Sequence, residues 1–310
     1  MSHYPVLLSE VMQYVGATSG SKFIDATVGG GGHAKEILKQ NAKATVLGLD
    51  WDKESLLLLE TELKKGKLNS KVILAHSNYA EIAAVAQQND FQPVDGIILD
   101  LGFSSLQLDN QDRGFSFQNS GPLDMRYDRT QILTAATILN QYTEKDLEVI
   151  FKKYGEEIHS KKIARDLVVH RKISSFSTAD QVLHVIKQAL PAPIRHKAND
   201  SARRIFQALR IEVNHELDNL ANALPEMFKL LAPKGRLVVI SFQSLEDRIV
   251  KNFFLELARG CICPSDFPQC ICGNEPKAKI LTKKPVTATD QELAENGRSK
   301  PAKLRAIEKI

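Results

Sequence analysis

Short apolar runs alternate with amphipathic segments over the first hundred residues of the chain. The runs predict strands over residues 21–27, 44–49, 71–75 and 94–101. The segments between them predict helices over residues 33–40, 51–65 and 79–88. Strands that alternate with helices of this length form βαβ units, so the pattern predicts a parallel sheet covered by helices.

The alternation stops after residue 101. Residues 102–130 are rich in Gly, Asn, Asp and Ser and have no period, and a stretch of this length without structure is usually functional or mobile. Three helices are predicted next, over 143–155, 156–171 and 178–190. Thr143 and Asp146 form a capping box for the first of them, and the last is opened by the Ser177 to Asp180 stretch.

The α/β pattern resumes towards the end of the chain. A long helix over 201–231, a strand over 236–242, a helix from a Ser244–Asp247 capping box to about 258 and a weak strand near 279–282 are predicted there. No strand signal lies between about 105 and 200. We therefore expect an α/β core made of residues 1–108 and 204–310, interrupted by an all-helical domain over residues 109–203.

Composition and charge add constraints on location and partners. The 310 residues are 43% apolar, but no apolar run approaches the length of a membrane span, and the N-terminus has no signal-peptide pattern. We expect a cytoplasmic protein that does not bind membranes. The net charge is +4, with +4 on residues 110–203, +4 on 259–310 and −4 on the remainder. This distribution suits a polyanionic substrate held outside the core, and it suits ordinary solvated helix faces equally well.

A glycine-rich turn follows the first predicted strand, in the stretch Asp25-Ala-Thr-Val-Gly-Gly-Gly-Gly-His33. Such a bare backbone lets a ligand approach closely, and alone it fits NAD, FAD, S-adenosylmethionine or a simple tight turn. Asp50 ends the next strand, where a carboxylate can accept both ribose hydroxyls of an adenosine. Asp25 favours S-adenosylmethionine, because a carboxylate there attracts an ammonium and a sulfonium but repels a pyrophosphate. Tyr79 follows the third strand and is either an adenine-stacking ring or a half-buried aromatic at a helix start.

The fourth strand ends in Asp100, and Phe103 follows three residues later. An exocyclic amine on a base is a poor nucleophile because its lone pair is delocalised. An acceptor for its N–H group can orient it and stabilise the positive charge that develops on methylation. This acid and aromatic resemble the acid-x-x-aromatic loop of amino-methylating nucleic-acid enzymes. The alternative for Asp100 is a strand-end acid that caps the next turn.

Longer motifs of the chain resemble the bacterial 16S ribosomal RNA (cytosine-N4)-methyltransferase family, ribosomal RNA small subunit methyltransferase H. They occur in order at residues 3–8, 25–33, 100–109, 113–117, 122–126, 206–214, 240–248 and 302–305. The resemblance implies a Rossmann-like class I methyltransferase core with an inserted helical domain for RNA recognition. It also implies N4-methylation of a decoding-centre cytidine.

The resemblance further implies a partner, a cofactor and a set of site residues. The partner is 16S rRNA or the small ribosomal subunit rather than DNA. Whether the chain is a monomer or a homodimer stays open. The cofactor is S-adenosylmethionine, with contacts at Gly31, Gly32, His33, Asp50, Tyr79, Asp100 and Gln107, to which the charge argument adds Asp25. Asp100 and Phe103 are the catalytic residues.

Three positions depart from the family pattern. Phe103 and Leu106 stand where Val and Pro are expected, and Gln243 stands where His is expected. The first two departures leave Asp100 in place, whereas Gln243 argues against an essential proton transfer at that position. Two other function classes stay open at this point, an NAD-dependent oxidoreductase and a non-catalytic rRNA-binding assembly factor.

Two further sets of residues have a functional and a structural interpretation. The cysteines could hold a zinc ion or simply belong to a surface hairpin, and their Cys-x-Cys pairs are tighter than usual zinc spacings; they are Cys261, Cys263, Cys270 and Cys272. Methyl transfer itself is expected to need no metal. Five arginines could contact RNA phosphates or form ion pairs; they are Arg113, Arg126, Arg203, Arg204 and Arg210.

Overall fold

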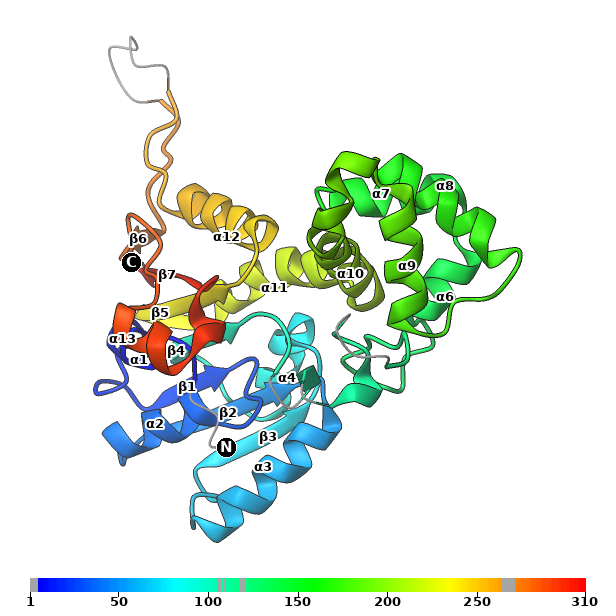
Figure 1. Cartoon of the computed structure of the whole chain (residues 1–310). Coiled ribbons are helices and arrows are strands. Elements are labelled where there is room, and N and C mark those ends of the chain that lie inside the picture. The colour runs from blue at the N-terminus through cyan, green and yellow to red at the C-terminus, as the bar shows by residue number, and fades with distance from the viewer. Residues whose placement is uncertain (1–4, 105–106, 109, 117–120, 264–270) are drawn as a thin grey trace. The chain divides into compact units, whose positions relative to one another are not determined.

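The computed structural model describes residues 5–104, 107–108, 110–116, 121–263 and 271–310. The chain folds into two compact units (Figure 1). The first unit contains Met1–Gly102 and Leu217–Ile310, and the second contains Phe103–Glu216. The second unit therefore begins before residue 109 and ends after residue 203, because helix α10 (Ala198–Asn214) packs entirely within it.

The first unit is built on one sheet. In the described residues its strands are β1 (Lys22–Asp25), β2 (Thr45–Asp50), β3 (Val72–His76), β4 (Val94–Asp100), β5 (Leu231–Ser241), β6 (Ala278–Ile280) and β7 (Lys303–Lys309). Their order in space is β3-β2-β1-β4-β5-β7-β6. Strands β1 to β5 are parallel, whereas β7 runs antiparallel to β5 and to β6. The predicted α/β core is confirmed.

Helices cover both faces of this sheet because its buried strands are apolar on both sides (Figure 1). One face carries α1 (Leu8–Val15), α2 (Gly32–Gln40) and α3 (Lys53–Lys65). The other face carries α4 (Ile82–Gln88), α11 (Glu216–Leu230) and α12 (Ser244–Leu257). Alternate residues of a strand serve the two layers, as in β1, where Phe23 packs with the first set and Ile24 with the second.

The second unit is helical and has its own apolar core. Its longer helices are α6 (Ala135–Gln141), α7 (Glu144–Lys153), α8 (Ser160–Arg171), α9 (Ala179–Ala189) and α10. Buried side chains from all of them form one cluster. Within its described residues this unit has no strand, only a single isolated bridge between Pro122 and Thr178. The predicted helical character is confirmed.

Several predicted elements differ from the structure. The single helix expected over 201–231 is two helices, because His215 takes a left-handed backbone conformation with φ 51° and ends α10. The N-cap of α9 is Thr178, one residue after the predicted opening at Ser177, and the N-cap of α12 is Gln243, one residue before the predicted capping box at Ser244. Helix α1 and strand β7 were not predicted. Among the described residues, none of the helices combines the length and the hydropathy that a membrane span requires.

Candidate functional site

Three acidic residues end neighbouring strands at one edge of the sheet. Strand β1 lies between β2 and β4. The chain first adds β2 and β3 on one side of β1 and later adds β4 and β5 on the other, so the strand order reverses at β1. Asp25 is in register with Gly48 and Ile98, while Asp50 and Asp100 end β2 and β4. Ligands of parallel sheets bind beyond the carboxyl ends of the strands at such a reversal.

The glycine-rich turn is tied to the ends of both neighbouring strands. The backbone N–H of Gly29 donates to Asp50 Oδ2 at 2.8 Å, and the N–H of Val28 donates to the carbonyl of Leu49 at 2.8 Å. On the other side, the N–H of Asp100 donates to the hydroxyl of Thr27 at 2.7 Å. Asp50 therefore positions this turn, and Thr27 connects the turn to the end of β4.

The glycines of the turn differ in what they face. Gly31 has φ 74°, and a Cβ there would lie 2.5 Å from Leu59 Cδ1. A Cβ on Gly32 would lie 2.6 Å from Pro5 Cγ. Gly30 is exposed, and a Cβ on it would meet no described atom within 4 Å. Gly31 and Gly32 are thus required by packing within the protein, whereas the backbone at Gly30 faces open space.

Burial makes this edge of the sheet unfavourable for negative charge. Asp25 is only 1% exposed, and burial followed by repulsion from Asp50 raises its pKa to about 7. Burial also raises the pKa of Asp50 to about 6. The pKa of Asp100 is well above its usual range, because its carboxyl is buried and lies near the charges of Asp25 and Glu246.

Two carboxyl oxygens at this edge have no hydrogen-bond partner among the described residues. They are Oδ2 of Asp25 and Oδ1 of Asp100, and both atoms are buried. A buried acceptor without a partner is costly. A ligand that brings a positive charge and N–H donors would satisfy both oxygens and restore the ordinary acidity of the carboxyls. The residues present therefore fit a cationic ligand with amine groups.

Glu246 is a member of this charge cluster that the sequence analysis did not identify. Its side chain is 2% exposed and accepts hydrogen bonds from the N–H groups of Phe242 and Gln243, at 2.9 and 3.2 Å. Gln243, whose role the sequence left open, is the N-cap of α12 and donates from Nε2 to Glu246 at 3.0 Å. The available signal was a glutamate three residues after the true N-cap. The capping box was predicted one residue too late, at Ser244.

His33 and Tyr79 are both in the first unit, in different settings. His33 begins α2 after the glycines and is 5% exposed, with Nε2 3.1 Å from the carbonyl oxygen of Val6. Burial lowers its pKa to about 4, so the ring is neutral at physiological pH. These contacts fit a structural histidine, and the contact of His33 with the cofactor stays a prediction. Tyr79 follows β3 and is partly buried against the apolar cluster beneath α4.

Phe103 and Gln107 belong to the second unit. The Phe103 ring stacks on Phe115 with centroids 5.5 Å apart, and the guanidinium of Arg210 lies 5.0 Å from the Phe103 centroid. The side-chain oxygen of Gln107 accepts a hydrogen bond from the N–H of Ser104 at 2.9 Å and is buried. Leu106 lies outside the described residues.

The five candidate RNA-binding arginines have partners within the second unit. Arg113 is 2% exposed and donates to the backbone carbonyls of Arg126 and Tyr127. The other four form ion pairs, which are Arg126–Asp124, Arg203–Asp200, Arg204–Glu157 and Arg210–Glu216. Only the Arg203 pair is exposed at both side chains, at 69% and 52%. Of the two interpretations, RNA contacts and ion pairs, these four side chains form the ion pairs in the structure.

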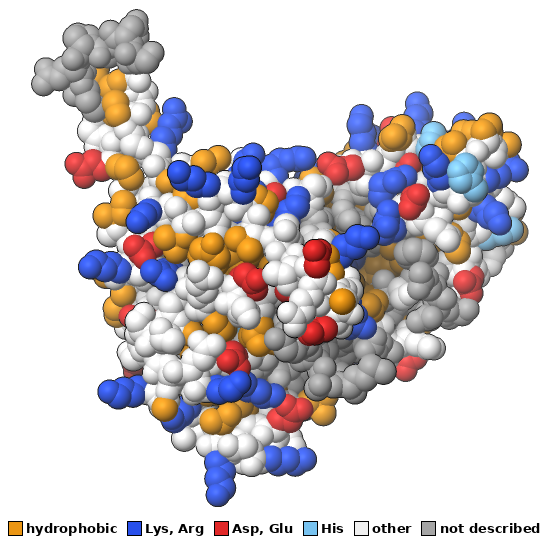
Figure 2. Space-filling model, turned by 60° about the vertical axis from the view of Figure 1, so that its left-hand side comes forward, with side chains coloured by type: hydrophobic (Ala, Val, Ile, Leu, Met, Phe, Trp, Pro, Cys, Tyr) orange, Lys and Arg blue, Asp and Glu red, His pale blue; other side chains and the backbone are white. Residues whose placement is uncertain are grey.

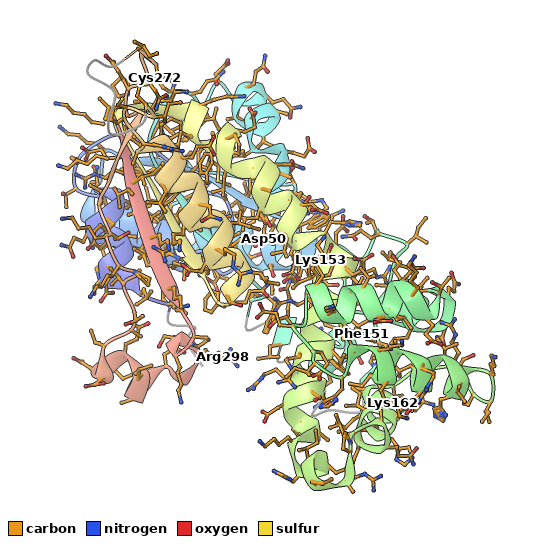
Figure 3. All side chains as sticks on the ribbon, turned by 90° about the horizontal axis from the view of Figure 1, so that it is seen from above. Asp50, Phe151, Lys153, Lys162, Cys272 and Arg298 are labelled. Atoms are coloured by element: carbon orange, nitrogen blue, oxygen red, sulfur yellow. The ribbon has the colours of Figure 1, made fainter. Side chains whose placement is uncertain are left out.

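The structure brings three of the four cysteines together, Cys261, Cys263 and Cys272. Cys270 lies outside the described residues. The segment that carries the three follows α12 and lies well apart from Asp50 when seen from above (Figure 3). The cysteine cluster and the acidic sheet edge are therefore separate features of the first unit.

Comparison with known proteins extends over the whole chain. A family model, the MraW methylase family, matches residues 1–310. The ribosomal RNA small subunit methyltransferase H of Carboxydothermus hydrogenoformans is 45% identical over 309 residues, which cover 100% of this chain and 98% of the relative. Proteins of the same name from Heliobacterium modesticaldum and Halothermothrix orenii are 46% and 44% identical. The Heliobacterium match covers 99% of this chain and 98% of that relative. The Halothermothrix match covers 100% of this chain and 99% of that relative.

Proposed function

Because the chain belongs to the MraW methylase family, we propose that it methylates a decoding-centre cytidine of 16S rRNA on the N4 amine. The methyl donor is S-adenosylmethionine, and the reaction takes place on the small ribosomal subunit in the cytoplasm. One observation carries this proposal. Asp25 and Asp100 end adjacent strands beside a glycine turn in which Gly30 is exposed, and each has a buried carboxyl oxygen that lacks a described partner.

S-adenosylmethionine carries the positive charge and the N–H donors that the two buried carboxyl oxygens lack. It supplies an activated methyl group on a sulfonium, an ammonium group and an adenosine with two ribose hydroxyls. Asp25 would accept from the ammonium, and Asp50 would accept from the ribose, since each of its oxygens has one backbone donor and a second lone pair. Gly31 and Gly32 would shape the turn, while Tyr79 would contact the adenine.

The same residues disfavour a dinucleotide. The pyrophosphate of NAD would place two negative charges beside carboxyls that are already difficult to ionise. Thermal unfolding distinguishes the two ligands directly. We expect S-adenosylhomocysteine to raise the Tm of the protein and NAD to leave it unchanged; stabilisation by NAD alone would favour an oxidoreductase.

Asp100 would act on the amine that receives the methyl group. The nitrogen–carbon bond forms as the carbon–sulfur bond breaks, and the nitrogen must then lose one proton. Oδ1 of Asp100 can accept the amine N–H, orient the nitrogen lone pair and receive that proton.

The second unit would hold the RNA. Phe103, Phe115 and Tyr127 form a continuous stack, with ring centroids 5.5 and 5.6 Å apart at successive steps. Arginine and aromatic surfaces of this kind bind unstacked bases of RNA. Lys and Arg side chains are spread over the surface of this unit as well (Figure 2). We assign Phe103 the role of a wall against which the target base packs.

The test is transfer of a labelled methyl group from S-adenosylmethionine to small subunits that lack the modification. Digestion to nucleosides should yield labelled N4-methylcytidine. In Asp100→Asn, methyl transfer should fall by about 10²- to 10⁴-fold, because the general base is lost, while S-adenosylhomocysteine binding is retained.

Asp90→Asn is the matched control, since Asp90 is exposed in the turn before β4 and its left-handed backbone, with φ 49°, accepts asparagine. It should keep full activity. Full activity in Asp100→Asn would contradict the mechanism. Absence of any labelled nucleoside with the unmodified protein would favour a non-catalytic assembly factor.

A further inference from the structure

The segment between α12 and β6 has no apolar core of its own. None of the described residues in 259–263 and 271–277 is buried. Ile262 and Ile271 are 51% and 74% exposed, and Figure 2 shows hydrophobic side chains along this projection of the first unit. A segment that buries so little apolar surface requires another source of order, such as a disulfide or a bound metal.

Three sulfur atoms of this segment lie close together. The Sγ atoms of Cys261, Cys263 and Cys272 all lie within 4.8 Å of one another, and those of Cys261 and Cys272 are 3.7 Å apart. Four sulfurs at about 2.3 Å from a tetrahedral zinc ion are separated by about 3.8 Å, whereas a disulfide brings its sulfurs to about 2.05 Å. The observed separation excludes a disulfide and fits two sulfurs bound to one metal ion.

Backbone N–H groups point at two of these sulfurs. Ile271 donates to the sulfur of Cys263 at 3.4 Å, and Ile262 donates to the sulfur of Cys272 at 3.3 Å. The two arms of the segment, residues 259–263 and 271–277, are thus joined by hydrogen bonds in both directions. A backbone N–H beside a thiolate stabilises its negative charge, as the outer contacts of metal sites do.

The turn after Cys272 adds further hydrogen bonds to the sulfur cluster and between the two arms. Gly273 has φ 59°, a conformation that disfavours other residues. The next N–H, of Asn274, approaches the sulfur of Cys272 at 3.5 Å. The Asn274 side chain donates to the carbonyls of Arg259 and Gly260, at 2.9 and 2.7 Å, and so joins the two arms below the sulfurs.

We propose that Cys261, Cys263 and Cys272 bind a zinc ion that holds the two arms together. Soft thiolate ligands in a tetrahedral arrangement favour zinc over harder divalent ions such as magnesium. The three sulfurs leave one tetrahedral position for a further ligand. Because Cys272 lies well apart from Asp50, the ion has a structural role and takes no part in methyl transfer (Figure 3).

Metal content of the full-length chain tests this site. The protein is purified without chelators or metal-affinity columns, and zinc is measured by elemental mass spectrometry and by its release with a thiol-blocking reagent. We expect about one zinc ion per chain. After replacement by cobalt, thiolate-to-cobalt charge-transfer bands and the d–d bands of tetrahedral cobalt should appear. These measurements do not depend on methyl transfer, so their outcome is independent of the proposed function.

Substitutions identify the ligands. Cys261→Ser and Cys272→Ser should each weaken zinc binding at least about 10-fold, the smallest loss expected even for an outer contact of a metal site. Ile271→Ser is the matched control, because its side chain is exposed and its backbone N–H is kept; it should bind zinc as the parent does. Circular dichroism and cooperative thermal unfolding verify that each variant is folded.

Three results would overturn the proposal. The first is failure of the reduced, unmodified chain to bind zinc in competition with a chelator. The second is cobalt spectra without thiolate bands, which also needs no variant. The third is a disulfide between Cys261 and Cys272 in metal-free protein isolated without reductant.

Discussion

At the scale of single residues, the candidate site is a set of carboxyls placed where charge is costly. Asp25 is 1% exposed, and its neighbours Asp50 and Asp100 carry the same charge. The sequence identifies these acids by their positions at strand ends. It does not reveal that two of their oxygens are buried without a described partner. Buried acceptors without a partner lower the stability of the ligand-free protein.

Asp25→Asn should therefore stabilise the ligand-free protein at high pH. The pKa of Asp25 rises from 3.8 to about 7 on folding, so the folded state binds the proton more tightly and loses stability as the pH rises between these values. At about 1.4 kcal/mol for each pH unit, the effect is at most about 4 kcal/mol. Chemical unfolding should show Asp25→Asn to be more stable than the parent at pH 8 and equal to it near pH 4.

The same substitution should weaken S-adenosylmethionine binding, because a neutral amide attracts the ammonium less. The loss should be greatest at pH 8, where the parent carboxyl is ionised, and calorimetry at several pH values measures it. A variant that is less stable than the parent at pH 8, or that binds equally well, contradicts this account of Asp25.

At the scale of elements, the glycines of the turn differ in what surrounds them. Gly31→Ala should destabilise the first unit by about 2 kcal/mol or more, because φ is 74° and the new methyl group would meet Leu59. Gly30→Ala should leave the Tm unchanged, since its Cβ has no described neighbour. It should reduce affinity for S-adenosylhomocysteine about 10-fold if the ligand contacts this backbone. Unchanged affinity would place the ligand elsewhere.

Strand β7 depends on a buried ion pair with α12. Arg305 contacts Asp247 at 2.6 Å, with side chains 10% and 15% exposed. Arg305→Ala should cost about 3 kcal/mol or more, because it leaves a buried carboxylate without its main partner. Lys64→Ala removes the exposed Lys64–Glu60 pair and should cost less than about 1 kcal/mol. Urea unfolding followed by the fluorescence of Trp51, the single tryptophan, compares the two within the first unit. Equal losses would mean that burial of the Arg305 pair has no effect.

At the scale of the whole molecule, the second unit is a continuous stretch of chain whose two ends lie close together. Arg210 lies over Phe103, the first residue of the unit, and pairs with Glu216, the last, at 2.8 Å. Close ends allow a domain to be inserted into another without disturbing it. The apolar cluster of the unit is formed by its own helices.

A fragment of residues 103–216 should therefore fold alone. Circular dichroism should show helix, and thermal unfolding should be cooperative. Arg210→Ala in the fragment should lower its Tm, since the Arg210 and Glu216 side chains are only 14% and 7% exposed. A fragment that stays unfolded would show that its core requires the first unit.

The sequence predicted the elements that have a strong local signal. Strands β1 to β4 and the helices between them follow from apolar runs, and the Thr143–Asp146 capping box opens α7 as predicted. Strand β7 was missed because a basic stretch conceals its apolar positions. There Leu304, Ala306 and Ile307 are buried, and Asp247, more than fifty residues earlier, neutralises Arg305. The break at His215 was missed because apolar positions continue on both sides of it.

By itself, the sequence determined the α/β core, the helical insertion and three acids at strand ends, because periodicity and strand–helix alternation are local properties of the chain. The tertiary structure decided the rest. It decided that Asp25 and Asp100 are desolvated, that Gly31 serves packing while Gly30 faces open space, and that the candidate RNA-binding arginines have protein partners. Burial and the choice of hydrogen-bond and ion-pair partners depend on residues far apart in the chain, so no local sequence pattern predicts them.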